Sequence, residues 1–227
     1  MRPASRDTLL LLAKRPEPGR VKTRLCPPWS YEKAAQFYVC LLEDVLEATA
    51  AFAKALDAQA VLCLDPLDEG AQTLPFSVPA RFSVEAQRGS GLAARMENAV
   101  GAAFERGARR VLLRGSDTPM LSQAHFQEAL VALEECDFVL SPDRDGGYGL
   151  VGFSRPWPGL LDVPMSTDTV CADTLARAQD WGIGTACIEP CFDVDRWPDL
   201  GHLKRALRGA TGSLCPRTRA FLEAEIA

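Results

Sequence analysis

Five cationic side chains gather around one glycine near the amino end of the chain, in the stretch AKRPEPGRVKTRL that spans residues 13–25. Glycine lets backbone N–H groups come close to the oxygen atoms of a ligand, and lysine and arginine neutralise negatively charged oxygens. The stretch follows an apolar run at residues 9–12, so we expect a strand that leads into this loop. We therefore predict a cradle for a di- or triphosphate made of Lys14, Gly19, Arg20, Lys22, Thr23 and Arg24.

The distribution of charge favours a small anionic ligand over a nucleic acid. The whole chain has a net charge of -5, whereas its first 25 residues carry seven Lys and Arg against two acidic residues. Proteins that bind nucleic acids are more often basic overall. A single basic segment on an acidic chain suits a small anion, and a solvated basic arm is the alternative interpretation.

Two aspartate-containing segments have the chemistry to hold a metal ion beside the phosphates. Asp117, in RGSDTPML, directly follows a predicted strand, where a carboxylate suits Mg²⁺ or Mn²⁺. The alternative is that Asp117 caps the turn that follows. Asp193 and Asp195, in CFDVDRWPDL, precede a predicted helix whose start explains only one of the two acids. We prefer Asp195 as the second metal ligand, opposite Asp117.

A pocket for a second substrate is predicted from two further segments. The segment SPDRDGGYGLVGF, residues 141–153, has Asp143 and Asp145 spaced two apart, which resembles a D-x-D metal motif, and a glycine pair; the same pattern fits a hairpin turn. The segment PMSTDTV, residues 164–170, has a Ser-Thr pair before a predicted helix, where capping and anion binding are both possible. We expect the turn to line the pocket as well, which gives Asp145, Gly146, Gly147, Ser166 and Thr167 as substrate-binding residues.

The segment QRGSGLAARM, residues 87–96, places Gly89 just before a predicted helix, where it would shape the base or ribose part of a nucleotide pocket. Arg95 either reaches this pocket or is a surface charge of the helix, and we favour the surface charge. The two histidines, His125 and His202, lie on predicted helices, so we expect no histidine-based acid–base chemistry.

The composition of the chain indicates its cellular compartment and the classes of partner that it does not bind. The eight cysteines are scattered without a C-x-x-C pair, which indicates mostly buried, reduced thiols and no zinc site. No apolar run approaches the roughly 20 residues that span a bilayer, and the amino end lacks the pattern of a secretory signal. We expect a cytoplasmic protein that binds neither membrane nor nucleic acid.

Alternating strands and helices must position these residues. Such alternation predicts βαβ units in a mostly parallel sheet, and the Asp-Gly turn near residue 145 predicts one antiparallel strand. Ligands of such sheets bind outside the carboxyl ends of the strands, where the chemistry-bearing residues fall. We predict one α/β domain over residues 1–227, a three-layer α/β/α sandwich. The expected strands are residues 8–13, 60–64, 81–85, 110–113, 138–140, 148–153 and 185–188, and the expected helices are residues 30–56, 92–106, 122–135, 167–181 and 197–207, with a short helix after residue 209.

These motifs, in this order, resemble a family of small bacterial proteins with the GT-A fold of nucleotide-diphospho-sugar transferases, some described as glycosyltransferases of arsenosugar biosynthesis. The resemblance extends from about residue 9 to residue 200. The order is more distantly similar to guanylyltransferases that activate phospholactate or phosphoenolpyruvate. The resemblance implies that Lys14, Lys22 and Arg24 face nucleotide phosphates, that Asp117 and Asp195 hold the metal, and that Gly146, Gly147 and Ser166 contact the second substrate.

The expected activity is transfer from a nucleotide-activated donor. We predict a glycosyltransferase that depends on Mg²⁺ or Mn²⁺, takes a nucleotide sugar and a small-molecule acceptor, and uses Lys22, Arg24 and Asp117 as catalytic residues. One alternative is a nucleotidyltransferase that joins a nucleoside triphosphate to a phosphorylated small molecule. The other is a nucleotide-binding protein without catalysis.

Overall fold

The sheet is centred on the strand that precedes the basic loop. The computed structural model describes residues 6–67, 74–209 and 214–225. In it, β1 (Thr8–Lys14) pairs in parallel with β2 (Gln59–Asp65) on one side and β4 (Val111–Gly115) on the other. All residues of β1 except the last are buried, as expected for the central strand of a covered sheet. The seven strands lie in the order β3-β2-β1-β4-β6-β5-β7, with β3 at Phe82–Ala86, β5 at Phe138–Pro142, β6 at Tyr148–Phe153 and β7 at Thr185–Cys187.

One strand, β6, runs against its neighbours. It pairs antiparallel with both β4 and β5, and the remaining strand pairs are parallel. The antiparallel strand predicted from the Asp-Gly turn is therefore confirmed, as is the α/β class with a mostly parallel sheet. The loops after β1, β2 and β4 leave from the same edge of the sheet, so the residues that follow these strands are brought together.

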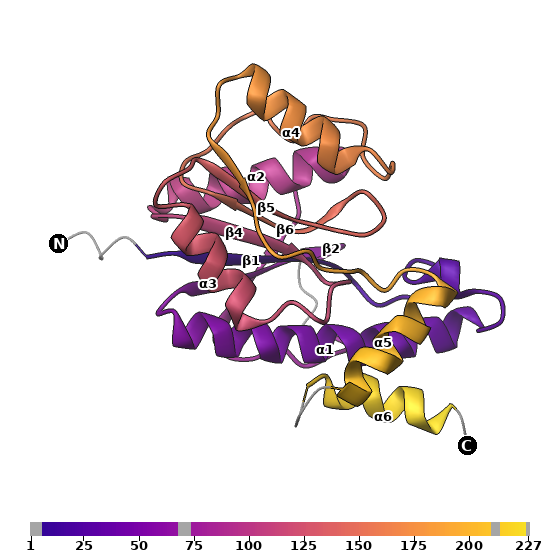
Figure 1. The fold of residues 1–227 in the computed structure, drawn as a ribbon. Coiled ribbons are helices and arrows are strands. Elements are labelled where there is room, and N and C mark those ends of the chain that lie inside the picture. The colour runs from indigo at the N-terminus through magenta and orange to yellow at the C-terminus, as the bar shows by residue number, and fades with distance from the viewer. Residues whose placement is uncertain (1–5, 68–73, 210–213, 226–227) are drawn as a thin grey trace.

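Helices cover both faces of the sheet (Figure 1). The alternating residues of β1 divide between two cores, because Leu9 and Leu11 point to one face and Leu10 and Leu12 to the other. The first core packs against α1, α3, α5 and α6, and the second packs against α2 and α4. The helices are α1 (Tyr31–Ala55), α2 (Leu92–Glu105), α3 (Gln123–Ala132), α4 (Val170–Asp180), α5 (Trp197–Gly209) and α6 (Pro216–Ala224).

The predicted cap of α1 is observed in the structure, whereas the predicted start of α4 is not. The hydroxyl of Ser30 accepts a hydrogen bond from the Lys33 backbone N–H at 3.2 Å, so the predicted cap of α1 is confirmed. The predicted start of α4 near residue 167 is wrong, because the helix begins at Val170 after Thr169. Ser166 has a left-handed φ of 64°, and residues 165–169 form turns and a bend instead of the first turn of the helix.

The carboxyl-terminal helix α6 is tied to the basic loop. The buried carboxylate of Asp44 in α1 accepts hydrogen bonds from the backbone N–H groups of Arg217 and Thr218, at 3.2 and 2.8 Å, and so caps α6. Phe221 of α6 packs against the rings of Trp29 and Phe37, with centroids 5.7 and 5.6 Å apart. The helix therefore supports the end of the loop that carries the cations.

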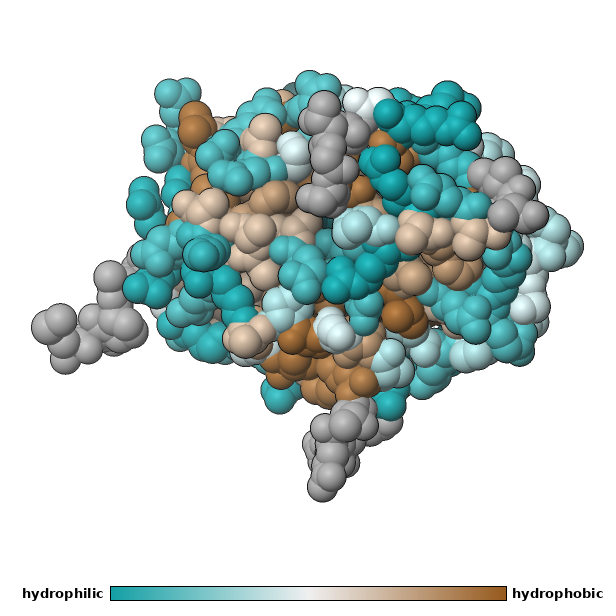
Figure 2. Space-filling model, turned by 90° about the horizontal axis from the view of Figure 1, so that it is seen from below, coloured by the Kyte–Doolittle hydropathy of each residue, from teal (hydrophilic) through white to brown (hydrophobic). Residues whose placement is uncertain are grey.

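Figure 2 views the side on which α1 lies and shows a largely hydrophilic surface with a hydrophobic area near the lower edge of the view.

The cysteines are free thiols in the part of the chain that the structure describes, which agrees with the expectation of a reduced protein. Their predicted burial holds for Cys63, Cys191 and Cys215 and is wrong for Cys187, which is exposed on the edge strand β7; the other four are half-buried. None of the described helices is both long enough and apolar enough to cross a membrane.

Candidate functional site

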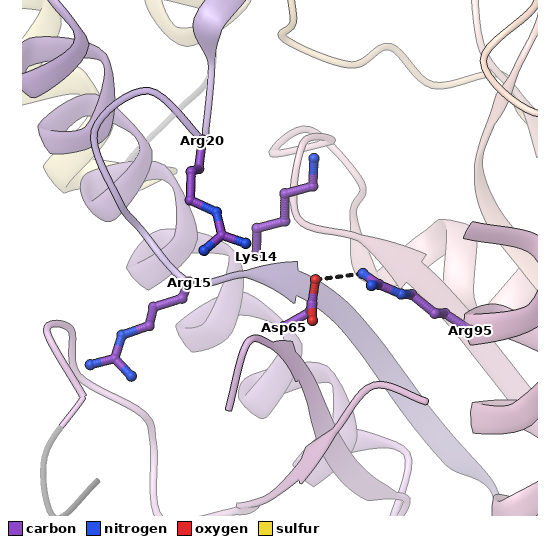
Figure 3. Close-up of a pocket in the computed structure, with 5 residues that line it drawn as sticks. All are labelled: Lys14, Arg15, Arg20, Asp65 and Arg95. Carbon is purple, nitrogen blue, oxygen red and sulfur yellow. Dashed lines mark hydrogen bonds and ion pairs between the residues drawn. The ribbon is translucent and has the colours of Figure 1, made fainter. Parts of the chain in front are cut away.

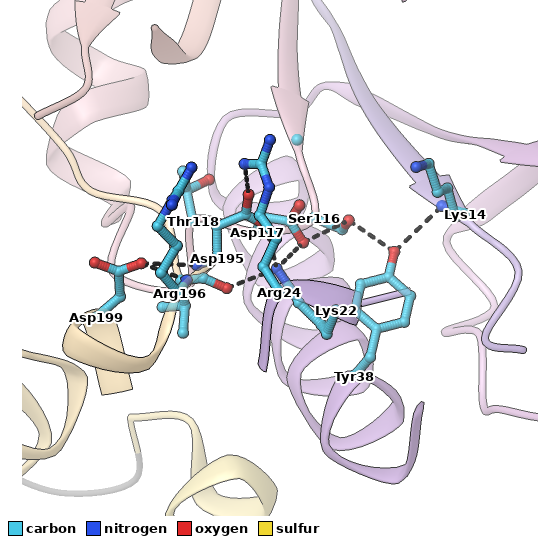
Figure 4. Close-up of polar contacts among 12 residues, drawn as sticks. Lys14, Lys22, Arg24, Tyr38, Ser116, Asp117, Thr118, Asp195, Arg196 and Asp199 are labelled. Atoms are coloured by element: carbon cyan, nitrogen blue, oxygen red, sulfur yellow. Dashed lines mark hydrogen bonds and ion pairs between the residues drawn. The ribbon is translucent and has the colours of Figure 1, made fainter. Parts of the chain in front are cut away.

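The side chain of Lys22 lies at the centre of a polar cluster that joins the basic loop to two distant aspartates (Figure 4). Its ammonium nitrogen Nζ is 2.6 Å from Oδ1 of Asp117 and 3.7 Å from Oδ1 of Asp195. It also donates a hydrogen bond of 2.7 Å to the backbone carbonyl of Val194. Only 2% of the Lys22 side chain is exposed, so this charge is held inside the protein by its own carboxylates.

A second ion pair joins the same segments. A guanidinium nitrogen of Arg24 lies 2.6 Å from Oδ2 of Asp195. The backbone N–H of Val194 donates to the Asp117 carbonyl at 2.9 Å, which holds the segment at residues 193–195 beside the end of β4. Three regions that are far apart in the sequence therefore meet at one place, as expected from the sequence for Lys22, Arg24, Asp117 and Asp195.

A buried tyrosine links this cluster to the end of β1. The Tyr38 hydroxyl contacts the Ser116 hydroxyl at 2.8 Å and accepts a hydrogen bond from the Lys14 backbone N–H at 3.2 Å. The Lys22 ammonium lies 5.8 Å from the centre of the Tyr38 ring. Burial raises the pKa of Tyr38 well above its ordinary range, and the nearby Asp117 carboxylate raises it further, so the hydroxyl stays protonated.

A buried arginine supports the loop that carries Asp117. The guanidinium of Arg114, which is 1% exposed, donates to the Thr118 carbonyl at 2.5 Å and to the Thr49 hydroxyl at 3.2 Å. Burial lowers the pKa of Arg114 to about 10. The Thr118 carbonyl follows Asp117 directly, so Arg114 fixes the backbone from which the Asp117 carboxylate extends.

A cationic cavity of about 300 Å³ lies beyond Lys14, on the side of the cluster toward β2 (Figure 3). Among the described residues, Asp65 is the one carboxylate in its lining and pairs with Arg95 at 2.5 Å. Glu17, outside the lining, pairs with Arg20 at 2.9 Å and with Arg15 at 3.8 Å, so the cavity keeps an excess of positive charge. Arg95 also donates to the Gly89 carbonyl at 3.3 Å, so it lines the cavity, and our preference for a plain surface charge is wrong. The lining residues are Lys14, Arg15, Arg20, Asp65 and Arg95.

Gly19 and Gly89 have different local roles. Gly19 has a φ of 77° and open space around it, so it permits a turn that other residues rarely adopt. At Gly89 a side chain would meet Ala94 and Asn98 at about 3 Å, so this glycine allows the segment before α2 to lie close to the helix. Thr23 begins a short 3₁₀ helix, Thr23–Leu25, and is exposed.

A second cavity, of about 230 Å³, lies on the other side of the Lys22 cluster and is rich in carboxylates. Arg24 and Asp195 belong both to the cluster and to the wall of this cavity. Arg144 stacks over the ring of Phe192 with 5.4 Å to its centre. The acidic cavity is lined by Arg24, Asp143, Arg144, Asp145, Phe192, Asp193, Asp195, Arg196, Asp199 and His202.

Two carboxyl groups in this wall have strongly shifted pKa values. Burial raises the pKa of Asp193 to about 8, and the negative charges of Asp143, Asp145 and Asp195 add to the shift. Burial raises the pKa of Asp143 to about 6, with a contribution from Asp145. These carboxylates repel one another and sit partly out of water, which is a common feature of functional sites.

The predicted substrate-binding residues of the hairpin fall partly in this cavity. Asp145 lines it and accepts a hydrogen bond from the Gly147 backbone N–H at 3.0 Å. Gly146 has a φ of 88°, and a Cβ atom there would lie 1.9 Å from the Asp168 carbonyl oxygen. Packing against residue 168 therefore explains this glycine without any ligand. Ser166 is exposed, and Thr167 keeps its hydrogen bonds within its own loop, to Pro164 and Thr169.

The carboxylates predicted as metal ligands have suitable donor atoms but are engaged by cations. Hard carboxylate oxygens suit Mg²⁺ and Mn²⁺, and Asp117 and Asp195 approach the same nitrogen atom. Within the described ranges no group of three or more His, Cys, Asp or Glu side chains is arranged to hold a metal ion. A metal at this pair would therefore need oxygens from a ligand, such as phosphate, to complete its coordination.

Several residues of the site carry no local sequence signal. Tyr38 lies within an ordinary helical pattern, and Arg114 and Ser116 lie in the motif of Asp117 without a predicted role of their own; the fold brings them to the cluster. Asp65 lies at the end of β2, a position at which a carboxylate gives a weak signal of a site. Asp143 belongs to a D-x-D pattern that fits a turn or a metal motif, and its burial is evident only in the folded chain.

Comparison with known proteins identifies a family and similar folds. The model of the family described as "Uncharacterized protein conserved in bacteria (DUF2064)" matches residues 48–167. A crystal structure of a proposed nucleotide-diphospho-sugar transferase from Desulfovibrio desulfuricans G20 is 31% identical, covers 98% of this chain and 96% of its own, and aligns with a TM-score of 0.85. No curated protein sequence matches the chain significantly.

More distant solved structures share the fold. Rv0371c from Mycobacterium tuberculosis H37Rv is 19% identical, with a TM-score of 0.55 over 88% of this chain and 98% of its own. A 4-diphosphocytidyl-2C-methyl-D-erythritol synthase from Anaerococcus prevotii DSM 20548 is 12% identical, with a TM-score of 0.54 over 90% of this chain and 99% of its own. The chain therefore has the fold of nucleotide-diphospho-sugar transferases and nucleotidyltransferases, and its named structural neighbours include transferases.

Proposed function

The chain belongs to the DUF2064 family of bacterial proteins, and from this premise we propose that it is a glycosyltransferase with a nucleotide-diphospho-sugar donor and a small-molecule acceptor. The contact of the Lys22 ammonium with both Asp117 and Asp195 carries the proposal. This cluster lies between a cationic cavity and an acidic one. Opposite charges on the two sides suit an anionic donor and an acceptor that is not anionic.

The donor nucleotide belongs on the cationic side. Four cations line this cavity against the carboxylates of Asp65 and the adjacent Glu17, and the remaining positive charge suits the oxygens of a diphosphate. The cavity of about 300 Å³ lies at the carboxyl ends of β1 and β2. We assign phosphate contacts to Lys14, Arg20, Lys22 and Arg24, with Gly19 and Thr23 shaping the loop and Gly89 shaping the nucleotide pocket.

The acceptor belongs on the acidic side. Its hydroxyl or thiol attacks the sugar carbon, the bond from that carbon to the diphosphate oxygen breaks, and the nucleoside diphosphate leaves. Five aspartates and three arginines line the acidic cavity, and with Asp193 protonated near neutral pH a small negative excess remains, which suits a neutral acceptor better than a phosphorylated one. We assign Asp145 and Gly147 to this pocket. Gly146, Ser166 and Thr167 remain predicted contacts on its hairpin and loop side.

Catalysis in this proposal depends on stabilising the departing diphosphate. Lys22 and Arg24 supply positive charge whose attraction strengthens as negative charge develops on the leaving oxygens. Before a donor binds, ion pairs with Asp117 and Asp195 keep both cations at this place. A bound Mg²⁺ or Mn²⁺ ion, held by Asp117 and Asp195 together with phosphate oxygens, would supply further positive charge to the leaving group.

A nucleotidyltransferase is the second candidate, because the same loop would hold a nucleoside triphosphate and a distant structural neighbour, a CMP:2-keto-3-deoxy-manno-octonic acid synthetase, is complexed with CTP. A phosphorylated acceptor would then attack the α-phosphate and release pyrophosphate. The carboxylate-rich acceptor cavity argues against this candidate, and the reaction products separate the two.

The test is an incubation with Mg²⁺ or Mn²⁺ and panels of nucleotide sugars, nucleoside triphosphates and small acceptors. We expect release of a nucleoside diphosphate from one nucleotide sugar, and an Asp117→Asn variant to lose about 100-fold or more of this activity. An Asp180→Asn variant, which removes an exposed carboxylate at the end of α4, is the matched control and should retain full activity. Pyrophosphate release instead would favour the second candidate, and binding of a nucleotide without turnover would indicate a non-catalytic protein.

A further inference from the structure

We propose that Lys22 is a resident cation that competes with a divalent metal ion for Asp117 and Asp195. The metal-free protein is then neutralised by its own lysine, and metal affinity stays low until a diphosphate draws the ammonium away. The diphosphate in this statement rests on the proposed function, whereas the competition itself rests only on contacts within the chain.

The Lys22 ammonium is held by two short contacts and one longer ion pair. Of its three N–H donors, two have acceptors at 2.7 Å (Val194 carbonyl) and 2.6 Å (Asp117), and Asp195 lies at ion-pair distance, 3.7 Å. The side chain is 2% exposed. Lys22 therefore cannot contact a phosphate oxygen unless it first releases one of these partners.

The carboxylates of Asp117 and Asp195 are accessible to solvent, whereas the Lys22 ammonium is buried. The side chains of Asp117 and Asp195 are 42% and 29% exposed, so a metal ion in solution has access to them. It would share these carboxylates with Nζ, and a divalent ion within a few ångströms of an ammonium meets direct charge repulsion. Arg24 reduces the free negative charge of Asp195 further.

A diphosphate reverses this balance. Its oxygens accept hydrogen bonds from the Lys22 ammonium, which frees the carboxylates and removes the repulsion from the metal ion. The same oxygens supply further ligands to the metal. Coupling of this kind is reciprocal, since a diphosphate that promotes metal binding is itself bound more tightly in the presence of the metal. Lys22 thereby sets the order in which the components of the site assemble.

The test measures Mn²⁺ binding without any nucleotide, from the electron paramagnetic resonance signal of free Mn²⁺. A Lys22→Met variant removes the resident charge and should bind Mn²⁺ about tenfold more tightly than the unaltered protein, within the usual range of coupling between sites. A Lys54→Met variant removes an exposed charge in the last turn of α1, outside the proposed site, and its Mn²⁺ affinity should match that of the unaltered protein. The double variant with Asp117→Asn should lose the gain.

A second variant guards against misfolding. Lys22→Gln keeps a hydrogen-bond donor for the Val194 carbonyl while removing the charge, and circular dichroism checks that each variant is folded. Mn²⁺ should also raise the melting temperature of Lys22→Met more than that of the unaltered protein, because the metal replaces the lost charge. Equal Mn²⁺ affinity in folded Lys22→Met, Lys22→Gln and unaltered protein would overturn the proposal, as would a gain that survives Asp117→Asn.

A further arm separates this inference from the proposed function. UDP and GDP are added in turn, with their own Mn²⁺ binding measured without protein and subtracted. We expect one of them to tighten Mn²⁺ binding in the unaltered protein and to do so less in Lys22→Met. If neither nucleotide binds, the proposed function fails, and the nucleotide-free comparison still decides the competition.

Discussion

At the scale of single residues, the site is a balance of charges held close together. Lys22 and Arg24 form ion pairs with Asp117 and Asp195, whereas burial and neighbouring carboxylates dominate the surroundings of Asp193 and Asp143, with Lys22 offsetting only part of the effect at Asp193. Their pKa values are therefore raised by burial and mutual repulsion. Near neutral pH, Asp193 is largely protonated, and ionising it adds a charge to an already acidic wall.

The raised pKa of Asp193 predicts how the stability of the folded protein depends on pH. The pKa of Asp193 is raised in the folded protein to about 8, so its favourable contribution is present below its ordinary pKa of about 4 and is lost as the pH rises through about 8. An Asp193→Asn variant should therefore gain more in its urea midpoint, relative to the unaltered protein, at about pH 9 than at about pH 5. Measurements in the presence of a chelator keep metal ions out of the comparison. An Asp180→Asn control should show no such difference, and an equal shift of Asp193→Asn at both pH values would contradict the prediction.

At the scale of elements, the β5–β6 hairpin places Asp145 in the acidic cavity and depends on one glycine to do so. Gly146 lies at the turn with a φ of 88°, and its carbonyl accepts a hydrogen bond from the Cys171 backbone N–H at 2.8 Å. The turn is therefore packed directly against the start of α4. This close approach explains the glycine at this position in physical terms, because even one methyl group would collide with the backbone at Asp168.

A matched pair of glycine substitutions tests this packing. Gly182, after α4, has a φ of 67° and nothing within 4 Å of the place that a methyl group would occupy, so Gly182→Ala should cost only the strain of a left-handed conformation, about 1 kcal/mol. Gly146→Ala adds a collision at 1.9 Å and should cost about 3 kcal/mol in the free energy of unfolding. Urea unfolding of both variants measures the difference. Similar losses for the two would show that the hairpin is not packed against residue 168.

At the scale of the whole molecule, the sheet order brings the loops after β1, β2 and β4 to one edge and places a cavity of opposite character on each side of Lys22. The order β2-β1-β4 alone makes neighbours of Asp65, Lys14 and Asp117. The antiparallel β6 then places the hairpin with Asp145 on the far side of the cluster from the cationic cavity. The separation of donor and acceptor sides thus follows from strand order.

Much of this arrangement could be predicted from the sequence because its signals are local. Apolar runs indicate the seven strands, the Ser30 cap indicates α1, and cations after one strand with aspartates after others predict a shared site. The partners of Lys22 could not be predicted in the same way, because the Val194 carbonyl and the Tyr38–Ser116 contact depend on tertiary packing. The start of α4 could not be predicted either, because the left-handed backbone of Ser166 leaves no mark in residue type.

The most direct test of the central claim is a crystal structure of the chain with a nucleoside diphosphate and Mn²⁺, in which the anomalous scattering of manganese locates the metal. We predict manganese density between Asp117 and Asp195, diphosphate oxygens within hydrogen-bond reach of Lys22 and Arg24, and a Lys22 ammonium moved off Asp117. A diphosphate bound away from the basic loop, or manganese bound away from both aspartates, would contradict the account.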